Sequence, residues 1–258
     1  MGEVNIPPLN PLLTGGDVGS NRCLLITGTV IPNSNYVSHK NVEERLKEYH
    51  NALVYYSTHF SGESIYFLEN SAYDFSSNPD FNKLFSEKVI TLMKFPVSDK
   101  YEQGKGFQEF EMLDKAVDKL NGNYHSFIKI TGRYIVRNLK QILGSERNGI
   151  MIDRHKKTRV AHTNVFSSTF DFYNNYLKGL YKSVNDGKGI IIERLVYDKI
   201  KSSGVDSQVK LFPKNLQIEG ISGSYGLPLK RNNLKMRIRN IERKLLRLAG
   251  INEFLMEY

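Results

Sequence analysis

Short apolar runs alternate with amphipathic helical patterns along the first half of the chain, and this alternation is the feature that most constrains the fold. Three runs are typical of buried strands: CLLITGTVI at residues 23–31, SIYFLE at 64–69 and VITLMKF at 89–95. Helical spacing marks residues 41–58, with Asn41 as a plausible cap, and a short helix is expected at 81–85. Strands that alternate with helices predict a mostly parallel sheet covered on both faces. We therefore expect an α/β chain with a Rossmann-like first half.

The segment from Gly104 to Asn138 combines a Gly-Lys-Gly turn, an amphipathic helix and a strand. Gly104 and Gly106 would let the backbone approach a ligand closely, and the helix N-terminus after them offers N–H groups that favour an anion. Lys129 and Arg133 lie towards the carboxyl end of the strand, where open α/β sheets bind ligands. The segment predicts an anion-binding pocket, although each of its patterns is also common in ordinary turns and strand ends.

Composition limits the classes of partner that the protein can have, but it does not identify the partner. The net charge of +9 favours an anionic partner: nucleic acid, phospholipid headgroups or a phosphorylated substrate. The single cysteine, Cys23, excludes an internal disulfide and a multi-cysteine metal site, which fits a reducing compartment. The sequence has no signal-peptide pattern and no apolar run of bilayer-spanning length, so a cytoplasmic location is expected.

Several common kinds of site have no motif in this sequence. The six histidines lack the spacings of zinc or non-haem iron sites, and the chain has no D-x-D, GxGxxG, P-loop or GxSxG motif. General acid–base chemistry stays open. Asp153 and Glu193 each follow an apolar run, the second leading into a helix-like segment, and Glu69 and Glu109 lie at element junctions, so any of the four could face a cleft. A carboxylate in such a place is more often a helix cap or half of a surface ion pair.

The C-terminal segment is strongly basic. Between Lys230 and Arg247 it has eight basic residues and one acidic residue, with an apolar stripe at helical spacing between them. Such a helix is typical of a membrane-surface or nucleic-acid contact, and the alternative is a docking helix whose outer face is solvated. The cations expected to bind a membrane are Lys230, Arg231, Lys235, Arg237, Arg239, Arg243, Lys244 and Arg247.

Five segments resemble, in order and spacing, a group of bacterial glycosyltransferases encoded with capsule, O-antigen and other surface-polysaccharide genes. They are LLITGTVIP, ERLKEYHNALVYY, IYFLENSAYDFS, GKGFQEFEMLDKAV and FIKITGRYIVRN. The later ISGSYG also fits, and the likeness covers about residues 22–226. The resemblance implies a single GT-A-like domain at 22–229, with an irregular arm at 1–21 and a basic amphipathic helix at 230–258.

The resemblance also implies an activity. The enzyme would move a sugar from a nucleotide-sugar donor to a lipid-linked or polymer-linked glycan by an inverting displacement, at the inner face of the cytoplasmic membrane. A UDP-sugar is the expected donor, with UDP-galactofuranose as one candidate. A typical GT-A enzyme holds a metal through D-x-D; without that motif, cations such as Lys129 and Arg133 would neutralise the diphosphate, and Mn²⁺ or Mg²⁺ bound by another acidic pair is the alternative.

Two sets of site residues follow from these strand-end positions together with the resemblance. Glu193 is the first candidate for the base and Asp153 the second. The expected donor-binding residues are Thr27, Gly28, Thr29, Glu69, Asn70, Ser71, Gly104, Lys105, Gly106, Lys129, Thr131, Gly132 and Arg133. Two other functions stay open: a nucleic-acid-binding protein, supported only by the charge, and a catalytically inactive glycosyltransferase-like partner subunit.

Overall fold

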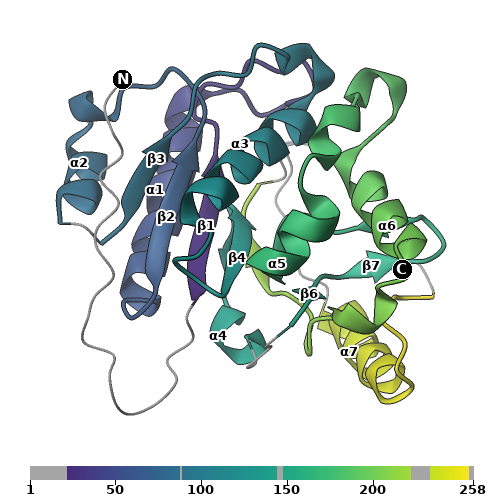
Figure 1. Cartoon of the computed structure of the whole chain (residues 1–258). Coiled ribbons are helices and arrows are strands. Elements are labelled where there is room, and N and C mark those ends of the chain that lie inside the picture. The colour runs from purple at the N-terminus through teal and green to yellow at the C-terminus, as the bar shows by residue number, and fades with distance from the viewer. Residues whose placement is uncertain (1–21, 88, 144–147, 222–232, 256–258) are drawn as a thin grey trace.

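The computed structural model describes residues 22–87, 89–143, 148–221 and 233–255, so the arm expected at 1–21 lies outside the described residues. The chain folds around a seven-stranded sheet of order β10-β6-β9-β4-β1-β2-β3 (Figure 1). Its strands are β1 (Arg22–Gly28), β2 (Ser64–Glu69), β3 (Thr91–Lys94), β4 (Ser126–Thr131), β6 (Ile150–Met151), β9 (Val165–Thr169) and β10 (Val209–Lys210). Among these strands, β9 alone runs antiparallel to its neighbours, β4 and β6. The expected α/β class with a mostly parallel sheet is confirmed.

Two small two-stranded sheets and seven α-helices complete the described part of the fold. The small sheets pair β5 (Ile135–Val136) with β11 (Ile218–Glu219), and β7 (Arg154–His155) with β8 (Val160–Ala161). The helices are α1 (Val42–His59), α2 (Pro79–Ser86), α3 (Lys105–Leu120), α4 (Leu139–Ile142), α5 (Phe170–Phe172), α6 (Ile192–Ser202) and α7 (Asn233–Leu248).

The helices form a layer on each face of the sheet. In β1, Leu24 and Ile26 pack with α1 and α2, whereas Cys23 and Leu25 pack with α3, α5 and α6 (Figure 1). Successive strand residues point to opposite faces, so a strand covered on both sides has to be apolar throughout. This explains the unbroken apolar run at the start of the chain's first strand.

The first long helix begins where its sequence predicts. The side chain of Asn41 accepts a hydrogen bond from the backbone N–H of Glu44 at 3.1 Å. Glu43 and Glu44 lie in the first turn, where carboxylates complement the helix dipole. The predicted cap is confirmed, and α1 buries Tyr49, Leu53 and Tyr56 on its inner face.

Of two predictions for the second half, one is confirmed and one is wrong. The apolar run at 190–192 is expected to lead Glu193 into a helix, and α6 begins at Ile192 with Glu193 in its first turn. The aromatic segment TFDFYNNYLKGLYKSV at 169–184 has helical spacing, but it is not one helix. It passes from α5 into a π-helical turn, Tyr173–Leu177, and Gly179, with φ of 82°, separates that turn from a 3-10 turn.

The basic helix α7 docks on the domain through a buried ion pair. Both guanidinium Nη atoms of Arg243 donate to the Asp153 carboxylate, and Nη2 also donates to the side chain of Asn215 at 2.7 Å. Arg243 is fully buried, so the expectation that it contacts a membrane is wrong. Asp153 follows β6 and is held as the counter-ion, which argues against its role as a base.

The remaining C-terminal cations differ in whether the structure describes them and in how exposed they are. Lys230, Arg231 and the side chain of Lys235 lie outside what the structure describes, and Arg239 is half-buried. Three are exposed: Arg237, Lys244 and Arg247. Among the described residues, no helix combines the length and the apolar character needed to span a bilayer.

The Arg243–Asp153 pair yields a prediction about stability. Arg243→Met should lower the free energy of unfolding by about 3–5 kcal/mol, because it leaves a buried carboxylate without its counter-ion. The matched control is Arg237→Met on the exposed side of the same helix, which should change it by less than about 0.5 kcal/mol. Urea unfolding of the three proteins measures both values, and equal losses for the two variants would contradict the proposed role of the pair.

Candidate active site

The carboxyl ends of β1, β2 and β4 form one edge, because these three strands are parallel neighbours. In register, Thr27 lies beside Thr131 of β4, and Gly28 lies beside Glu69 of β2. Parallel strands bring their ends together at the edge where open α/β sheets bind ligands. The expected donor-binding residues of these strands are therefore neighbours in space.

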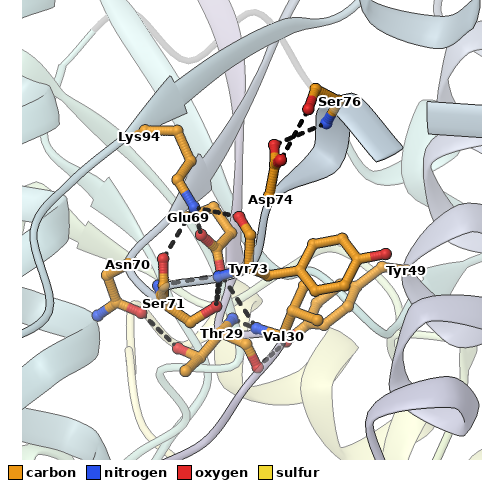
Figure 2. Close-up of polar contacts among 10 residues, drawn as sticks. All are labelled: Thr29, Val30, Tyr49, Glu69, Asn70, Ser71, Tyr73, Asp74, Ser76 and Lys94. Atoms are coloured by element: carbon orange, nitrogen blue, oxygen red, sulfur yellow. Dashed lines mark hydrogen bonds and ion pairs between the residues drawn. The ribbon is translucent and has the colours of Figure 1, made fainter. Parts of the chain in front are cut away.

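Glu69 is the centre of a buried hydrogen-bond network at the end of β2. One of its carboxylate oxygens accepts hydrogen bonds from the backbone N–H groups of Val30 at 3.1 Å and Ser71 at 3.0 Å, and from the Ser71 hydroxyl. The other accepts from Lys94 Nζ at 2.7 Å, and Figure 2 shows the lysine reaching this carboxylate. Lys94 also donates to the carbonyls of Ser71 and Tyr73 at 2.8 Å. Glu69 is fully buried with its acceptors used, so it shapes this edge.

The segment after β1 is held by its neighbours. The hydroxyl of Thr29 donates to the side chain of Asn70 at 2.6 Å, and its backbone N–H donates to Tyr49 Oη at 2.9 Å (Figure 2). Arg45 of α1 donates through Nε to the carbonyl of Thr29 at 3.1 Å. These contacts fix the position of the end of β1.

A second polar cluster lies between the sheet and α3. Glu109 Oε1 accepts from the hydroxyls of Thr27 at 2.6 Å and Thr131 at 3.3 Å, and pairs with Lys129 Nζ at 2.6 Å. Thr27, Lys129 and Thr131 meet there because alternate residues of β1 and β4 face α3. The Lys129 side chain is fully buried, whereas a quarter of the Glu109 side chain is exposed. The carboxylate is anchored on the protein side and reachable from solvent.

The pKa of Glu109 is below its ordinary value. Burial by itself would raise this pKa, but the charge of Lys129, with hydrogen bonds from Lys129, Thr27 and Thr131, outweighs it. Glu109 is therefore ionised at neutral pH.

Glu193 lies near Glu109, and its pKa is shifted in the opposite direction, above its ordinary value. Burial raises its pKa, the charges of Glu109 and Asp186 raise it further, and Lys105 lowers it. It comes close because α6 begins against the start of α3: a Cβ built on Gly106 would lie 2.9 Å from Cγ2 of Ile192. Two carboxylates whose surroundings shift their pKa values in opposite directions are typical of acid–base sites.

The N-terminus of α3 is already occupied by an anion from the protein. Asp186 accepts the backbone N–H of Lys105 at 3.1 Å and also a bond from the N–H of Gly106. Burial raises the pKa of Asp186 and these two bonds lower it, with a net rise. In this conformation the backbone N–H groups of Lys105 and Gly106 cannot hold the diphosphate or sugar as expected, since the Asp186 carboxylate takes them.

Packing alone explains the glycines of the expected site. Gly104 has φ of 114°, and a Cβ there would lie 2.1 Å from Asp186 Oδ2. Gly132 donates its N–H to the carbonyl of Thr27 at 2.8 Å, and a Cβ on it would lie 2.6 Å from the same oxygen. Gly28 likewise lies against the ring of Phe67. These positions bring chain segments together.

The expected diphosphate clamp is bound to internal partners. The three N–H donors of Lys129 bind Glu109, the Thr131 hydroxyl at 3.1 Å and the Thr163 carbonyl at 2.9 Å. The buried Arg133 pairs with Glu48 of α1 at 2.6 Å. Lys129 cannot bind a phosphate directly without losing an internal partner, so its role as a direct clamp is wrong in this conformation. The contact of Arg133 with Glu48 uses one of its several N–H donors, so the role of Arg133 in the clamp stays a prediction.

The end of β4 does not fit a divalent cation either. It presents Lys129, Thr131 and Arg133, and the carboxylates bound to it, Glu109 and Glu48, are paired with Lys129 and Arg133. Within the described segments, no group of three or more His, Cys, Asp or Glu side chains is arranged to hold a metal ion.

Three residues of this region carry no signal in the sequence. Glu48 and Arg45 belong to the helical pattern of α1, where charged side chains normally face solvent. Asp186 belongs to an ordinary NDGKG turn, and its contact with α3 joins residues 81 positions apart. The helix N-terminus predicts that some anion binds there, but not that the anion is Asp186.

Comparisons with known proteins add a distant structural similarity. No family model and no curated protein sequence matches the chain. Among solved structures, the chain is similar to a protein from Desulfovibrio desulfuricans G20 that bears the provisional name nucleotide-diphospho-sugar transferase. The identity is 10%, the TM-score is 0.47, and the match covers 75% of this chain and 80% of the other.

The Lys129–Glu109 pair predicts how stability depends on pH. Because the native pKa of Glu109 is lowered, its stabilising contribution is complete above the ordinary carboxyl pKa and is lost as pH falls through the native pKa. In Lys129→Met, burial should instead raise the native pKa, so the ionised carboxylate destabilises the fold as pH increases. The stability difference between wild type and variant, from urea unfolding at several pH values, should therefore grow from acid to neutral pH.

The control for this prediction is the double variant Lys129→Met, Glu109→Gln. It has no carboxylate at position 109, so its stability difference from Glu109→Gln should not change with pH. If the free energies of unfolding of wild type and Lys129→Met changed with pH in parallel, the ion pair would not set the charge of Glu109.

Proposed function

We propose that this protein is a nucleotide-sugar-dependent glycosyltransferase with a GT-A-like domain. It transfers a sugar, by a single inverting displacement, to a lipid-linked or polymer-linked glycan of a bacterial surface polysaccharide. The sequence resemblance over residues 22–226 supports the class of reaction, the surface-polysaccharide role and the expected UDP-sugar donor.

One observation carries the proposal: Glu109 is bonded to the carboxyl ends of β1 and β4, and Glu193 lies near enough for the charge of Glu109 to raise its pKa. Glu109 is ionised beside Lys129, and Glu193 has a raised pKa on the neighbouring helix. A base works best when its pKa lies nearer the working pH than that of an ordinary carboxylate. This favours Glu193 over Asp153, which is bound to Arg243.

In the proposed step, Glu193 takes the proton of the acceptor hydroxyl. The acceptor oxygen forms a bond to the anomeric carbon of the donor sugar, and the bond from that carbon to the diphosphate oxygen breaks. The nucleoside diphosphate leaves with the electron pair. Glu109 contributes a fixed negative charge near the sugar, where positive charge develops on the ring.

The leaving diphosphate needs positive charge. Lys105 at the start of α3 and Arg194 on the first turn of α6 are both exposed at this end of the two helices. They are the cations we assign to the diphosphate, in place of Lys129. Lys129 acts indirectly, by holding Glu109 ionised and in position.

The class of donor can be tested by thermal shift. UDP, GDP, CMP and dTDP, with their sugars, should be screened with EDTA and with Mn²⁺, because a ligand that binds the native state raises the melting temperature. We expect an increase with the uridine compounds that persists in EDTA. An increase that needs Mn²⁺ would contradict the metal-independent clamp, and no increase with any compound would contradict the transferase.

The role of Glu193 can be tested by kinetics once the donor is known. Glu193→Gln should lower kcat about 100-fold or more, because it removes the base without changing the shape of the side chain. In the wild type, activity should fall as pH decreases through a pKa above the ordinary glutamate value, since the base must be ionised. The variant should lack this acid limb.

The matched control is Glu111→Gln on the outer side of α3. Its carboxylate forms a partly exposed i,i+4 pair with Lys115 at 3.0 Å, away from the proposed chemistry. This variant should keep wild-type activity. Near-normal turnover in Glu193→Gln would remove Glu193 from the role of base, even if the donor still binds.

A further inference from the structure

The basic helix α7 attaches to the domain mainly through polar side chains, with one apolar contact in which Leu246 packs with Leu211 and Phe254. Besides the Arg243–Asp153 pair, Arg243 Nη1 donates to the carbonyl of Phe212 at 2.9 Å. Asn215 links to the helix twice: its N–H donates to Asn240 Oδ1, and its side chain donates to the carbonyl of Met236, both at 2.8 Å. These contacts fix which side of the helix turns inward.

The apolar stripe of α7 consequently faces out. Ile238, Ile241, Leu245 and Leu248 are 43%, 63%, 62% and 76% exposed. Their spacing of three, four and three residues places them on one side of the helix. The sequence leaves open that this segment is a helix docked on the domain. The helix does dock, but its apolar stripe is not the face that contacts the domain. An exposed row of four large aliphatic side chains is typical of an interaction surface.

The charges beside the stripe favour one class of partner. Arg237, Lys244 and Arg247 are exposed on the same helix. A second copy would meet this surface through the same surface, because two-fold interfaces are isologous, and would bring these cations together. An anionic lipid surface instead complements the cations and accepts the aliphatic side chains between them.

We propose that α7 docks the protein on an anionic bilayer surface, with Ile241, Leu245 and Leu248 entering the headgroup–acyl boundary. The buried Arg243 does not contact lipid. It holds the helix so that the stripe points outward. The proposal does not depend on the reaction at the sheet edge, and a lipid-linked acceptor would make the two compatible.

Vesicle sedimentation with the full chain tests the proposal. The wild type should bind vesicles of phosphatidylcholine and phosphatidylglycerol, but should bind vesicles of phosphatidylcholine alone far more weakly. Ile241→Glu should weaken binding to the anionic vesicles by about tenfold or more, because it puts a carboxylate into the contact. Lys244→Gln should weaken it about fivefold, and high salt should remove this difference.

The matched control is Val54→Glu, which adds the same charge at an exposed apolar position of α1. It should bind anionic vesicles almost as well as the wild type. Unchanged melting temperatures for the variants would show that the fold is intact. Vesicle binding that survives Ile241→Glu would overturn the proposal.

Self-association gives a different result. If the stripe joined two copies, light scattering would give a dimer for the wild type and a monomer for Ile241→Glu, with equal vesicle binding for both. That outcome would replace the lipid surface with a second copy of the chain. None of these measurements requires catalytic activity. The membrane proposal can therefore be contradicted without contradicting the proposed transferase, and the reverse also holds.

Discussion

The buried ion pair between Lys129 and Glu109 is the interaction on which the arrangement of the candidate site depends. It joins the fourth strand of the sheet to the helix that covers it, and the hydroxyl of Thr27 adds the first strand. Removing two charges from water is costly, so such a pair persists only where the geometry is good and further hydrogen bonds satisfy both groups. Here Thr131 and the carbonyl of Thr163 supply those bonds. The pair therefore specifies how α3 sits on the sheet edge, and with it the distance from α3 to α6.

The same arrangement explains why charge at this edge is mostly internal. A strand that ends in Lys129 and Arg133 predicts a cationic surface, yet both side chains are buried and paired. The N–H groups at the start of α3 are bound by Asp186 in the same way. Because these groups already have partners, a ligand at this edge meets the carboxylates of Glu109 and Glu193 and the exposed cations at the starts of α3 and α6. This is the arrangement expected of a site that moves a proton beside an anionic leaving group.

The sequence predicts the first half of the fold well because the signals there are local. Buried strands between helices have unbroken apolar runs, and the cap at Asn41 acts on a residue three positions away. The second half is predicted less well for a physical reason. Its strands β6, β7 and β8 have two residues each, so the sequence indicates extended segments there but not where each strand begins or ends, and a glycine at 179 interrupts the aromatic segment. Glu193 could be predicted as a candidate at the start of a helix, but its closeness to Glu109 could not.

Contacts between distant parts of the chain were the least predictable, and α7 illustrates the reason. A helical pattern with one apolar stripe normally predicts that the stripe packs inward, because apolar burial is the largest local term. In α7 the buried Arg243 reverses this orientation. Its carboxylate partner, Asp153, lies 90 positions earlier in the chain, and the carbonyl of Phe212 and the side-chain amide of Asn215 complete its hydrogen bonds. None of these three partners can be identified from the helix sequence. With the arginine buried, the rotation of the helix is fixed, and its aliphatic side chains face away from the domain.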